Sequence, residues 1–211
     1  MRYIVFSDVD GNLPALETML KDAGPAEGYI CLGDTVDYGP WANECVKLID
    51  GLPNRVVLEG NHEHYFLKGE YQSTNHIAQA FFDFCYPTFT QFDLIKDLPQ
   101  TYELKGFTFA HTIRDQYVYP DSDIELDNNY VVGHSHHQFK IEQAPYALYN
   151  PGSVGQNRKY INVINYIVLE TDTMDFTMKA ITYDESLIIN EMKKRQYPQI
   201  CIDYYNNKQR V

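Results

Sequence analysis

Five short polar clusters lie in the first two thirds of the chain, and their polar side chains are of types that bind metal ions or move protons. They are Asp8-Val9-Asp10, Gly33-Asp34, Gly60-Asn61-His62-Glu63, His111, and Gly133-His134-Ser135-His136. Most of them directly follow an apolar run that is typical of a β-strand. The carboxyl ends of strands in an open α/β sheet converge on one edge, where ligands bind. Carboxylate, amide and imidazole groups at such an edge predict a site for two divalent metal ions.

The carboxylate clusters are ambiguous when each is taken alone. Asp8 and Asp10 follow one strand two residues apart, and Asp34 follows the next strand. An aspartate at a strand-to-helix turn often only caps backbone N–H groups. Turn capping and metal binding therefore remain equal alternatives for each cluster by itself.

The histidine clusters differ in how strongly they indicate a site. The amide oxygen of Asn61 is a possible metal ligand, while the adjacent His62 remains free for acid–base chemistry. His111 is the weakest signal, because a histidine that ends a strand is usually a half-buried polar residue. The two-residue spacing of His134 and His136 aims both rings to the same side of an extended backbone.

The elements that must position these residues change character along the chain. Apolar strands at 3–6, 29–32 and 56–58 alternate with helices at 13–23 and 43–50. This alternation predicts parallel β-α-β units. Strands at 107–110 and 130–132 precede the last two clusters. Together with later strands at 146–149, 161–168 and 176–183, they predict a second sheet packed on the first.

The clusters span both halves of the sequence, so we expect one domain over residues 1–211. Within it, residues 64–100 form a helical insertion, and residues 184–211 form a C-terminal helix, at about 185–195, and a tyrosine-rich tail. The first strand begins at Tyr3, so we expect no signal peptide. The four cysteines lack CxxC spacing, which favours reduced thiols. Without an apolar stretch of membrane-spanning length, these features predict a cytoplasmic protein with no membrane association.

The overall charge limits the classes of partner. A formal net charge of -12 argues against general binding to a nucleic-acid backbone or to an anionic membrane. It does not exclude a phosphate substrate, because bound cations reverse the local field at their site.

The order of the clusters resembles the calcineurin-like metallophosphoesterase superfamily. Residues 7–17, Tyr38-Gly39-Pro40 and the segment Asn150-Pro151-Gly152-Ser153-Val154-Gly155-Gln156 are similar to its small single-domain bacterial and archaeal branch. The resemblance covers about residues 1–183. It implies a four-layer αββα sandwich, in which two mixed β-sheets are flanked by helices.

The resemblance also implies roles for the polar residues. Asp34 would bridge two metal ions; Asp8, Asp10 and His136 would hold the first; Asn61, His111 and His134 would hold the second. A hydroxide shared by the ions would attack phosphorus in line with the leaving oxygen. His62 would assist the leaving group, and Asp37 matches the acid that orients this histidine in related phosphoprotein phosphatases. A solvated loop aspartate is the alternative for Asp37.

Two departures from the family pattern affect these expectations. Most relatives carry histidine where this chain has Asp10, and a carboxylate there favours Mn²⁺ or Fe over Zn²⁺. The alternative is that Asp10 turns away and leaves the first ion weakly bound. Tyr38 replaces the arginine that phosphoprotein phosphatases place after the second aspartate. We therefore expect no dedicated phosphate-clamping arginine, and protein phosphatase is a poor match.

The leading hypothesis is a two-metal phosphoesterase that hydrolyses a phosphodiester or a small nucleotide-type phosphate. The tail resembles the carboxyl end of some bacterial phosphodiesterases that also cleave diadenosine tetraphosphate. One alternative is a broad phosphomonoesterase or protein phosphatase. Another is a non-catalytic scaffold like the retromer subunit of the superfamily, which lacks the histidine that this chain retains as His62. The oligomeric state stays open.

Overall fold

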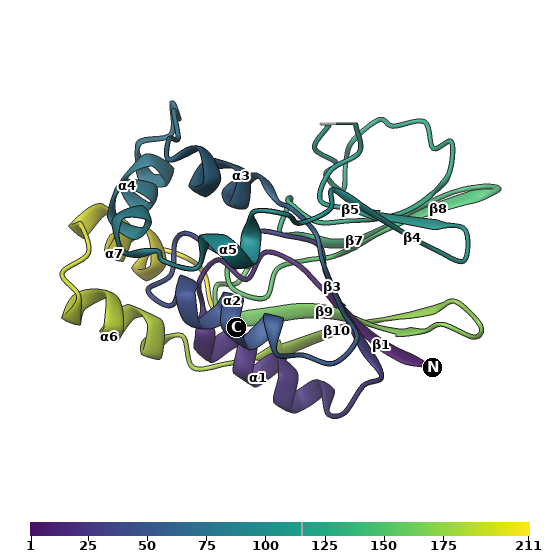
Figure 1. The fold of residues 1–211 in the computed structure, drawn as a ribbon, viewed down its shortest axis with the longest axis horizontal. Coiled ribbons are helices and arrows are strands. Elements are labelled where there is room, and N and C mark those ends of the chain that lie inside the picture. Colours follow the sequence, from purple (N-terminus) through teal and green to yellow (C-terminus); the bar gives the residue numbers. More distant parts are fainter. Residues whose placement is uncertain (115) are drawn as a thin grey trace.

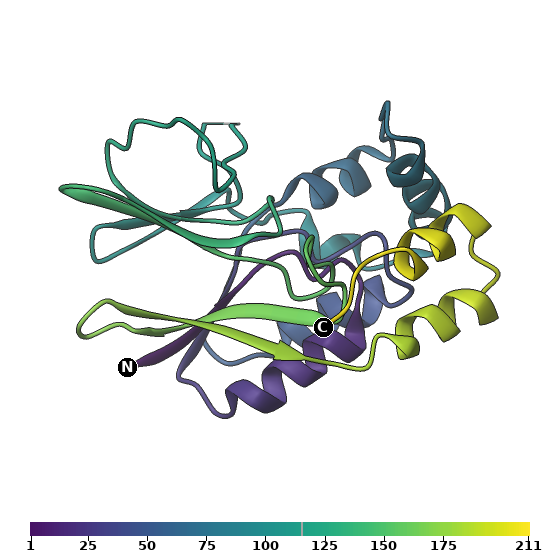
Figure 2. The ribbon, with the colours of Figure 1, turned by 180° about the vertical axis from the view of Figure 1, so that it is seen from behind.

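Two mixed five-stranded sheets lie one above the other in the computed structural model, which describes residues 1–114 and 116–211 (Figures 1 and 2). The first sheet has the order β10-β9-β1-β2-β3 and the second the order β4-β5-β6-β8-β7. The first sheet consists of β1 (Arg2–Phe6), β2 (Gly28–Cys31), β3 (Arg55–Val57), β9 (Val163–Glu170) and β10 (Asp175–Thr182). The second consists of β4 (Thr101–Leu104), β5 (Phe107–Ala110), β6 (Asn129–Val132), β7 (Gln138–Gln143) and β8 (Tyr146–Pro151).

Three adjacent strands of each sheet run parallel, and this places their carboxyl ends together. In the first sheet β1, β2 and β3 are parallel, with Val5 paired to Ile30 and Ile30 to Val56. In the second sheet β5, β6 and β8 are parallel. Strands β4, β7, β9 and β10 add antiparallel pairs. Strand β1 runs from the N-terminus toward the end of the molecule where α4, α6 and α7 gather (Figure 1).

The alternation of side chains along β1 explains how one strand contributes to two apolar layers. Ile4 and Phe6 pack against the helices on the outer face of the first sheet, while Val5 points into the layer between the sheets. Successive side chains of a strand point to opposite faces, so a strand covered on both sides is apolar throughout. Phe109 and Val131 of the second sheet complete the layer between the sheets.

The helices cover the outer face of the first sheet and one end of the molecule (Figure 1). They are α1 (Leu13–Ala23), α2 (Ala42–Asp50), α3 (Asn61–Lys68), α4 (His76–Cys85), the 3-10 turn η1 (Tyr86–Thr88), α5 (Phe92–Ile95), α6 (Ser186–Lys194) and α7 (Gln199–Asn206). Asn12 starts α1 because its side chain accepts a hydrogen bond from Ala15 N, and Pro14 fits the first turn. Gly24 ends α1 with φ +65.

The expected fold class is confirmed: two mixed sheets are flanked by helices. On the outer face of the second sheet, Tyr130 and Leu148 pack against residues of the loops. These include Ile113, Val118 and Leu126. The tail contains a helix, α7, that the sequence analysis did not identify.

All four cysteines are free and buried, in agreement with the expected reduced thiols; they are Cys31, Cys45, Cys85 and Cys201. Within residues 1–114 and 116–211, the helices are too short or too polar to cross a lipid bilayer.

Candidate metal centre

The loops that follow the parallel strands are joined to one another by backbone hydrogen bonds. Asp8 N donates to Gly33 O over 3.1 Å, and Asp10 N donates to Asp34 O over 3.0 Å. In the second sheet, Gly133 N donates to the carbonyl of His111 over 3.2 Å. These bonds join the first polar cluster to the second and the fourth to the fifth.

One group of donor atoms gathers around the side-chain oxygen of Asn61. Asn61 Oδ1 lies 2.7 Å from His134 Nδ1 and 3.1 Å from His111 Nε2. Asp34 Oδ2 lies 3.2 Å from the same His111 nitrogen. Ligand atoms of Asp34, His111 and His134 all lie within 4.8 Å of one another. The four predicted ligands of the second ion are therefore in contact as one cluster.

Backbone carbonyls set the orientation of two histidine rings. His111 Nδ1 donates to Leu32 O over 2.9 Å, and His136 Nδ1 donates to Gln156 O over 2.9 Å. A carbonyl only accepts, so Nδ1 of each ring carries a proton and Nε2 is the nitrogen left to face a metal ion. His136 Nε2 then faces Asp8 Oδ1 at 3.3 Å. This is the arrangement that metal-binding histidines require, with the second ring nitrogen held by a partner.

Several carboxylate oxygens in this region are buried and accept no hydrogen bond from the described part of the chain. They are Asp8 Oδ1, both oxygens of Asp10, and Asp34 Oδ2. The side chains of all three aspartates are almost completely inaccessible to solvent. Because buried polar atoms are normally paired, these unpaired acceptors fit cation binding.

The pKa shifts indicate a site that needs additional positive charge. Burial raises the pKa of Asp8 to about 7, and burial together with the neighbouring Asp8 carboxylate raises that of Asp10 well above its ordinary value. Burial also opposes ionisation of Asp34, but the charges of His111 and His62 outweigh it and lower the pKa of Asp34. Bound divalent cations would favour the ionised form of all three carboxyls.

His134 is suited to bind a metal ion as a neutral ring. Burial and the nearby His111 lower the pKa of His134 to about 3. A histidine must be unprotonated to donate a lone pair to a metal, so no proton needs to be removed from this ring near neutral pH.

Asp10 lies beside the same histidine as Asp8 but at a different ring edge. Its Oδ2 is 3.6 Å from His136 Nδ1, the nitrogen that donates to Gln156 O. Asp8 instead faces Nε2. Unlike Asp8, Asp10 does not face the nitrogen of His136 that is left for a metal ion. Ligation of a metal by Asp10 therefore stays a prediction.

His62 and Asp37 form a buried pair next to these donors. His62 Nδ1 lies 2.9 Å from Asp37 Oδ2, and His62 Nε2 lies 3.8 Å from Asp34 Oδ2. Burial lowers the pKa of His62, but the charges of Asp34 and Asp37 outweigh it and raise the pKa well above its ordinary value. Asp37 is fully buried, which excludes the alternative of a solvated loop aspartate.

Glu63 fixes the loop that carries Asp34. Its carboxylate accepts hydrogen bonds from Asp34 N at 2.8 Å, Thr35 N at 2.6 Å and Gly60 N at 2.9 Å. A side chain on Gly60 would clash with Asp34 Oδ1, at 2.2 Å from its Cβ position. Glu63 therefore holds the second and third clusters together rather than facing the metal ligands.

The backbone at the predicted ligands is held in an unusual conformation. Five of these residues have φ between +51 and +67: Asp8, Asp10, Asp34, His134 and His136. The left-handed region is unfavourable for residues with a side chain, and such residues concentrate at functional sites. The turns point these side chains across the edge between the two sheets.

Three tyrosines that the sequence analysis did not single out lie beside predicted site residues. The ring of Tyr117 stacks on His134 with 3.7 Å between centroids. Tyr65 and Tyr71 pack on each other at 4.5 Å, and their centroids lie 6.1 and 6.3 Å from that of His62. Their spacing along the chain gives no period or motif, so only the folded structure identifies them.

Arg158 is another residue near the predicted ligands that motif spacing did not identify. It follows the Asn150–Gln156 segment by two residues. Burial is the larger cause that lowers the pKa of His136, and the charge of Arg158 lowers it further. Its position shortly after a segment that resembles the family was the one feature of the sequence that could have identified it.

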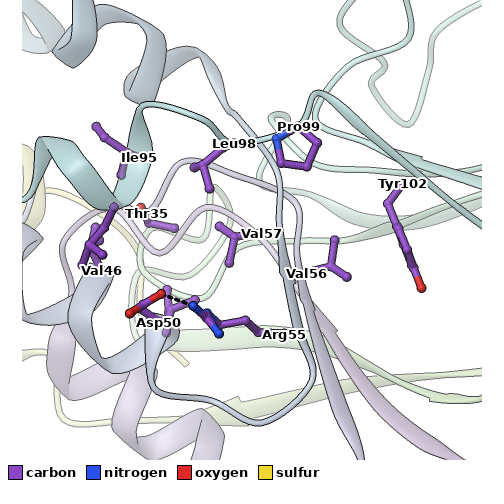
Figure 3. A pocket seen from close by; sticks show the side chains of 12 residues that line it. Thr35, Val46, Asp50, Arg55, Val56, Val57, Ile95, Leu98, Pro99 and Tyr102 are labelled. Carbon is purple, nitrogen blue, oxygen red and sulfur yellow. Dashed lines mark hydrogen bonds and ion pairs between the residues drawn. The ribbon is translucent and has the colours of Figure 1, made fainter.

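A cavity of about 490 Å³ lies elsewhere, between α2, β3 and α5 (Figure 3). Its lining is mostly apolar and includes Val46, Val57, Ile95 and Leu98. None of the predicted ligands lines it.

Comparison with known proteins agrees with this geometry. The family model described as calcineurin-like phosphoesterase matches residues 1–151. An uncharacterized protein of Methanocaldococcus jannaschii is 30% identical, and the match covers 92% of this chain and 93% of that protein.

Two solved structures share the fold over nearly their full length. A metallophosphoesterase of Sphaerobacter thermophilus has a TM-score of 0.82 and 24% identity, covering 98% of this chain and 99% of that one. A hypothetical protein of Pyrococcus horikoshii also has a TM-score of 0.82, with 16% identity and coverage of 100% and 99%.

Proposed function

Because the chain belongs to the calcineurin-like phosphoesterase family, we propose that it hydrolyses a phosphodiester or a nucleotide-type phosphate with two bound divalent cations. Membership makes the protein a metal-dependent phosphoric ester hydrolase. The substrate class, the number of ions and the residue roles below are our proposal, with Mn²⁺ or Fe²⁺ as the favoured metals and Zn²⁺ as a possible one.

The observation that carries the proposal is the convergence of carboxylate, amide and imidazole ligand atoms at the strand ends. Asp34, Asn61, His111 and His134 would hold one ion. The other would be held by Asp8 and His136, together with Asp34 and Asp10. When bound, two such ions supply a water-derived nucleophile for in-line attack and neutralise charge on the phosphoryl oxygens.

The protein's own acid is His62. Its Nδ1 faces Asp37 at 2.9 Å, which fixes the ring and favours a proton on Nε2. His62 would donate that proton to the leaving oxygen, or stabilise the charge that develops on it. The charges of Asp34 and Asp37 raise the pKa of His62 against the effect of burial, which favours the protonated ring.

The aromatic surroundings support an aryl or nucleoside group on the substrate. Tyr65 and Tyr71 stand next to His62, where the leaving group would lie, and Tyr117 stands next to His134. Planar bases stack on such rings without a requirement for specific sequence. A diester or nucleotide that carries a planar group would therefore gain contacts that a small alkyl phosphate does not make.

The test is a panel of esters and metals. The protein is loaded with Mn²⁺, Fe²⁺, Zn²⁺ or Mg²⁺, and its bound metal is measured. Turnover is then compared for a bis-aryl phosphate, an aryl monophosphate, a cyclic dinucleotide and a dinucleoside polyphosphate. We expect turnover with Mn²⁺ or Fe²⁺ and a preference for the diester or nucleotide substrates over the monophosphate.

A matched pair of variants distinguishes the metal centre from general loss of charge. Asp34→Asn removes the proposed bridging carboxylate and should lose both metal and turnover. Asp172→Asn changes an exposed aspartate whose ion-pair partners in the described part of the chain are the N-terminus and Lys105, and it should behave as the wild type. Preference for the monophosphate would indicate the broad monoesterase instead. A fully metal-loaded protein that hydrolyses none of the esters would support the non-catalytic scaffold.

A further inference from the structure

Arg158 lies on the loop that follows β8, and two residues far apart in the sequence hold one end of its side chain. Its Nη1 donates to Gln156 Oε1 over 2.5 Å and to the hydroxyl of Tyr204 over 2.7 Å. The Tyr204 hydroxyl in turn donates to Gln156 Oε1 over 2.8 Å. The three side chains therefore form a closed hydrogen-bonded group.

The remainder of the guanidinium has no anionic partner within residues 1–114 and 116–211. Its only protein hydrogen bonds in that part of the chain are the two made by Nη1, and both acceptors are neutral. Nε and Nη2 keep three N–H donors for another acceptor. A half-buried arginine without a counter-ion is unusual in a protein with a net charge of -12. The unpaired donors point to an anionic ligand.

This guanidinium is close to the proposed metal ligands. The backbone carbonyl of Gln156 accepts from His136 Nδ1, so the residue that holds Arg158 also orients a metal-binding ring. Burial opposes the charge of Arg158, but Tyr204, Tyr38, Asp10 and Asp8 outweigh that effect and raise its pKa. The amide nitrogen of Gln156 is also buried without an acceptor among the described residues.

The C-terminal segment fixes the position of Tyr204. The ring of Tyr204 packs on Phe81 of α4 with 5.8 Å between centroids, and Lys208 Nζ lies 4.6 Å from the Tyr204 ring centroid. Beyond α7, the carbonyl of Gln209 accepts from Ile161 N over 2.9 Å, which ties the tail to the loop of Arg158. Lys208 adds a second cation near this loop.

We propose that Arg158 is the phosphate-binding arginine of this enzyme, presented by the loop after β8 and oriented by Tyr204 of the C-terminal helix. Its free donors would hold non-bridging oxygens of the phosphoryl group in the fork geometry that a guanidinium offers. The arginine that Tyr38 replaces would thus be supplied from another part of the chain; the Tyr38 and Tyr204 rings lie 6.5 Å apart. The identity of the ligand as a phosphoryl group rests on the proposed function.

The experiment compares Arg158→Met, Arg158→Lys and Tyr204→Phe in the metal-loaded protein. KM and kcat are measured for an ester that the wild type hydrolyses, and the affinity for inorganic phosphate is measured by calorimetry. Loss of the charge-assisted hydrogen bonds in Arg158→Met should weaken phosphate binding about 10- to 100-fold. Arg158→Lys should retain part of the affinity, and Tyr204→Phe should weaken it less than Arg158→Met.

Two controls separate phosphate binding from a structural role. Metal content and Tm are recorded for every variant, and neither should change in Arg158→Lys. Arg55→Lys and Arg55→Met change an arginine whose partner is Asp50, beside the cavity of Figure 3, and should leave phosphate affinity at the wild-type value. If Arg158→Met fails to fold, the comparison of Arg158→Lys with Arg55→Lys decides the question.

The outcomes also separate this inference from the proposed function. Phosphate affinity and KM that stay at wild-type values in folded Arg158→Met and Arg158→Lys would overturn the inference while esterase activity stands. Arg158-dependent phosphate binding in a wild type that hydrolyses no ester would support the inference and refute the proposed function.

Discussion

Two regions of the molecule, the candidate metal centre and the cavity of Figure 3, differ in how their polar atoms are satisfied. The cavity has a volume of about 490 Å³ and an apolar lining, and its charged residues Asp50 and Arg55 pair with each other. At the metal centre, buried oxygens of Asp8, Asp10 and Asp34 accept no hydrogen bond within the described ranges. The difference shows why unpaired buried acceptors, rather than cavity size, single out the candidate site.

The two regions also differ in their backbone conformation. Predicted ligands such as Asp8 and His134 have φ of +53 and +67, whereas the cavity is lined mainly by regular elements, α2, β3 and α5. Strained turns persist only where the surrounding structure holds them in place. Substitutions at the metal centre should therefore change activity, and substitutions at the cavity should change stability.

Among variants that keep their metal, the largest expected effect is that of His62→Gln, which removes the proposed acid. We expect kcat to fall about 10²- to 10⁴-fold with the metal content unchanged, because the ring is near the ligands but is not proposed to bind metal. Steady-state kinetics together with metal analysis measures both. His64→Gln is the matched control, since His64 is exposed and pairs with Glu59. Wild-type turnover in His62→Gln would refute the assigned role.

Asp37→Asn should have a smaller effect on the same step. The amide keeps the shape of the side chain but no longer stabilises the charged His62 ring, so we expect kcat to fall about 10- to 100-fold. Asp50→Asn at the cavity is the control and should keep the wild-type kcat. Equal rates for the two variants would contradict a positioning role for Asp37.

Asp10→His tests the position at which this chain departs from most relatives. An imidazole in place of a hard carboxylate oxygen should shift metal preference from Mn²⁺ or Fe²⁺ toward Zn²⁺ by about tenfold. Competition between metals, followed by metal analysis, measures the shift. Unchanged metal content and activity would show that Asp10 does not bind metal, consistent with its position at the other edge of His136.

Ile95→Ala should have the smallest effect on activity and a clear effect on stability. Ile95 is almost fully buried where α5 lines the cavity, and its truncation should lower the free energy of unfolding by about 2–5 kcal/mol. Ile200→Ala, at an exposed position of α7, should change it by less than about 0.5 kcal/mol. Denaturant unfolding and kcat/KM test both variants. A large fall in kcat/KM for Ile95→Ala would break the distinction between the regions.

Much of the fold and of the candidate site was predictable because local signals agreed with one another. Apolar runs followed by polar residues mark strand ends, and parallel strands bring those ends to one edge. The pairing of His62 with Asp37 was also expected, from the resemblance. Helix α7 was not identified, because its apolar positions lie among tyrosines that are equally typical of strands.

The sequence by itself determined the type and order of the groups at the metal centre, since each cluster belongs to the turn after its own strand. Only the tertiary structure decided which nitrogen of His111 and His136 faces the carboxylates, because carbonyls of distant residues hold the other nitrogen. It also decided the place of Arg158, which Tyr204 orients from a helix that packs on α4. Such contacts join residues far apart in the chain, and they form only when the two sheets and the C-terminal helices pack together.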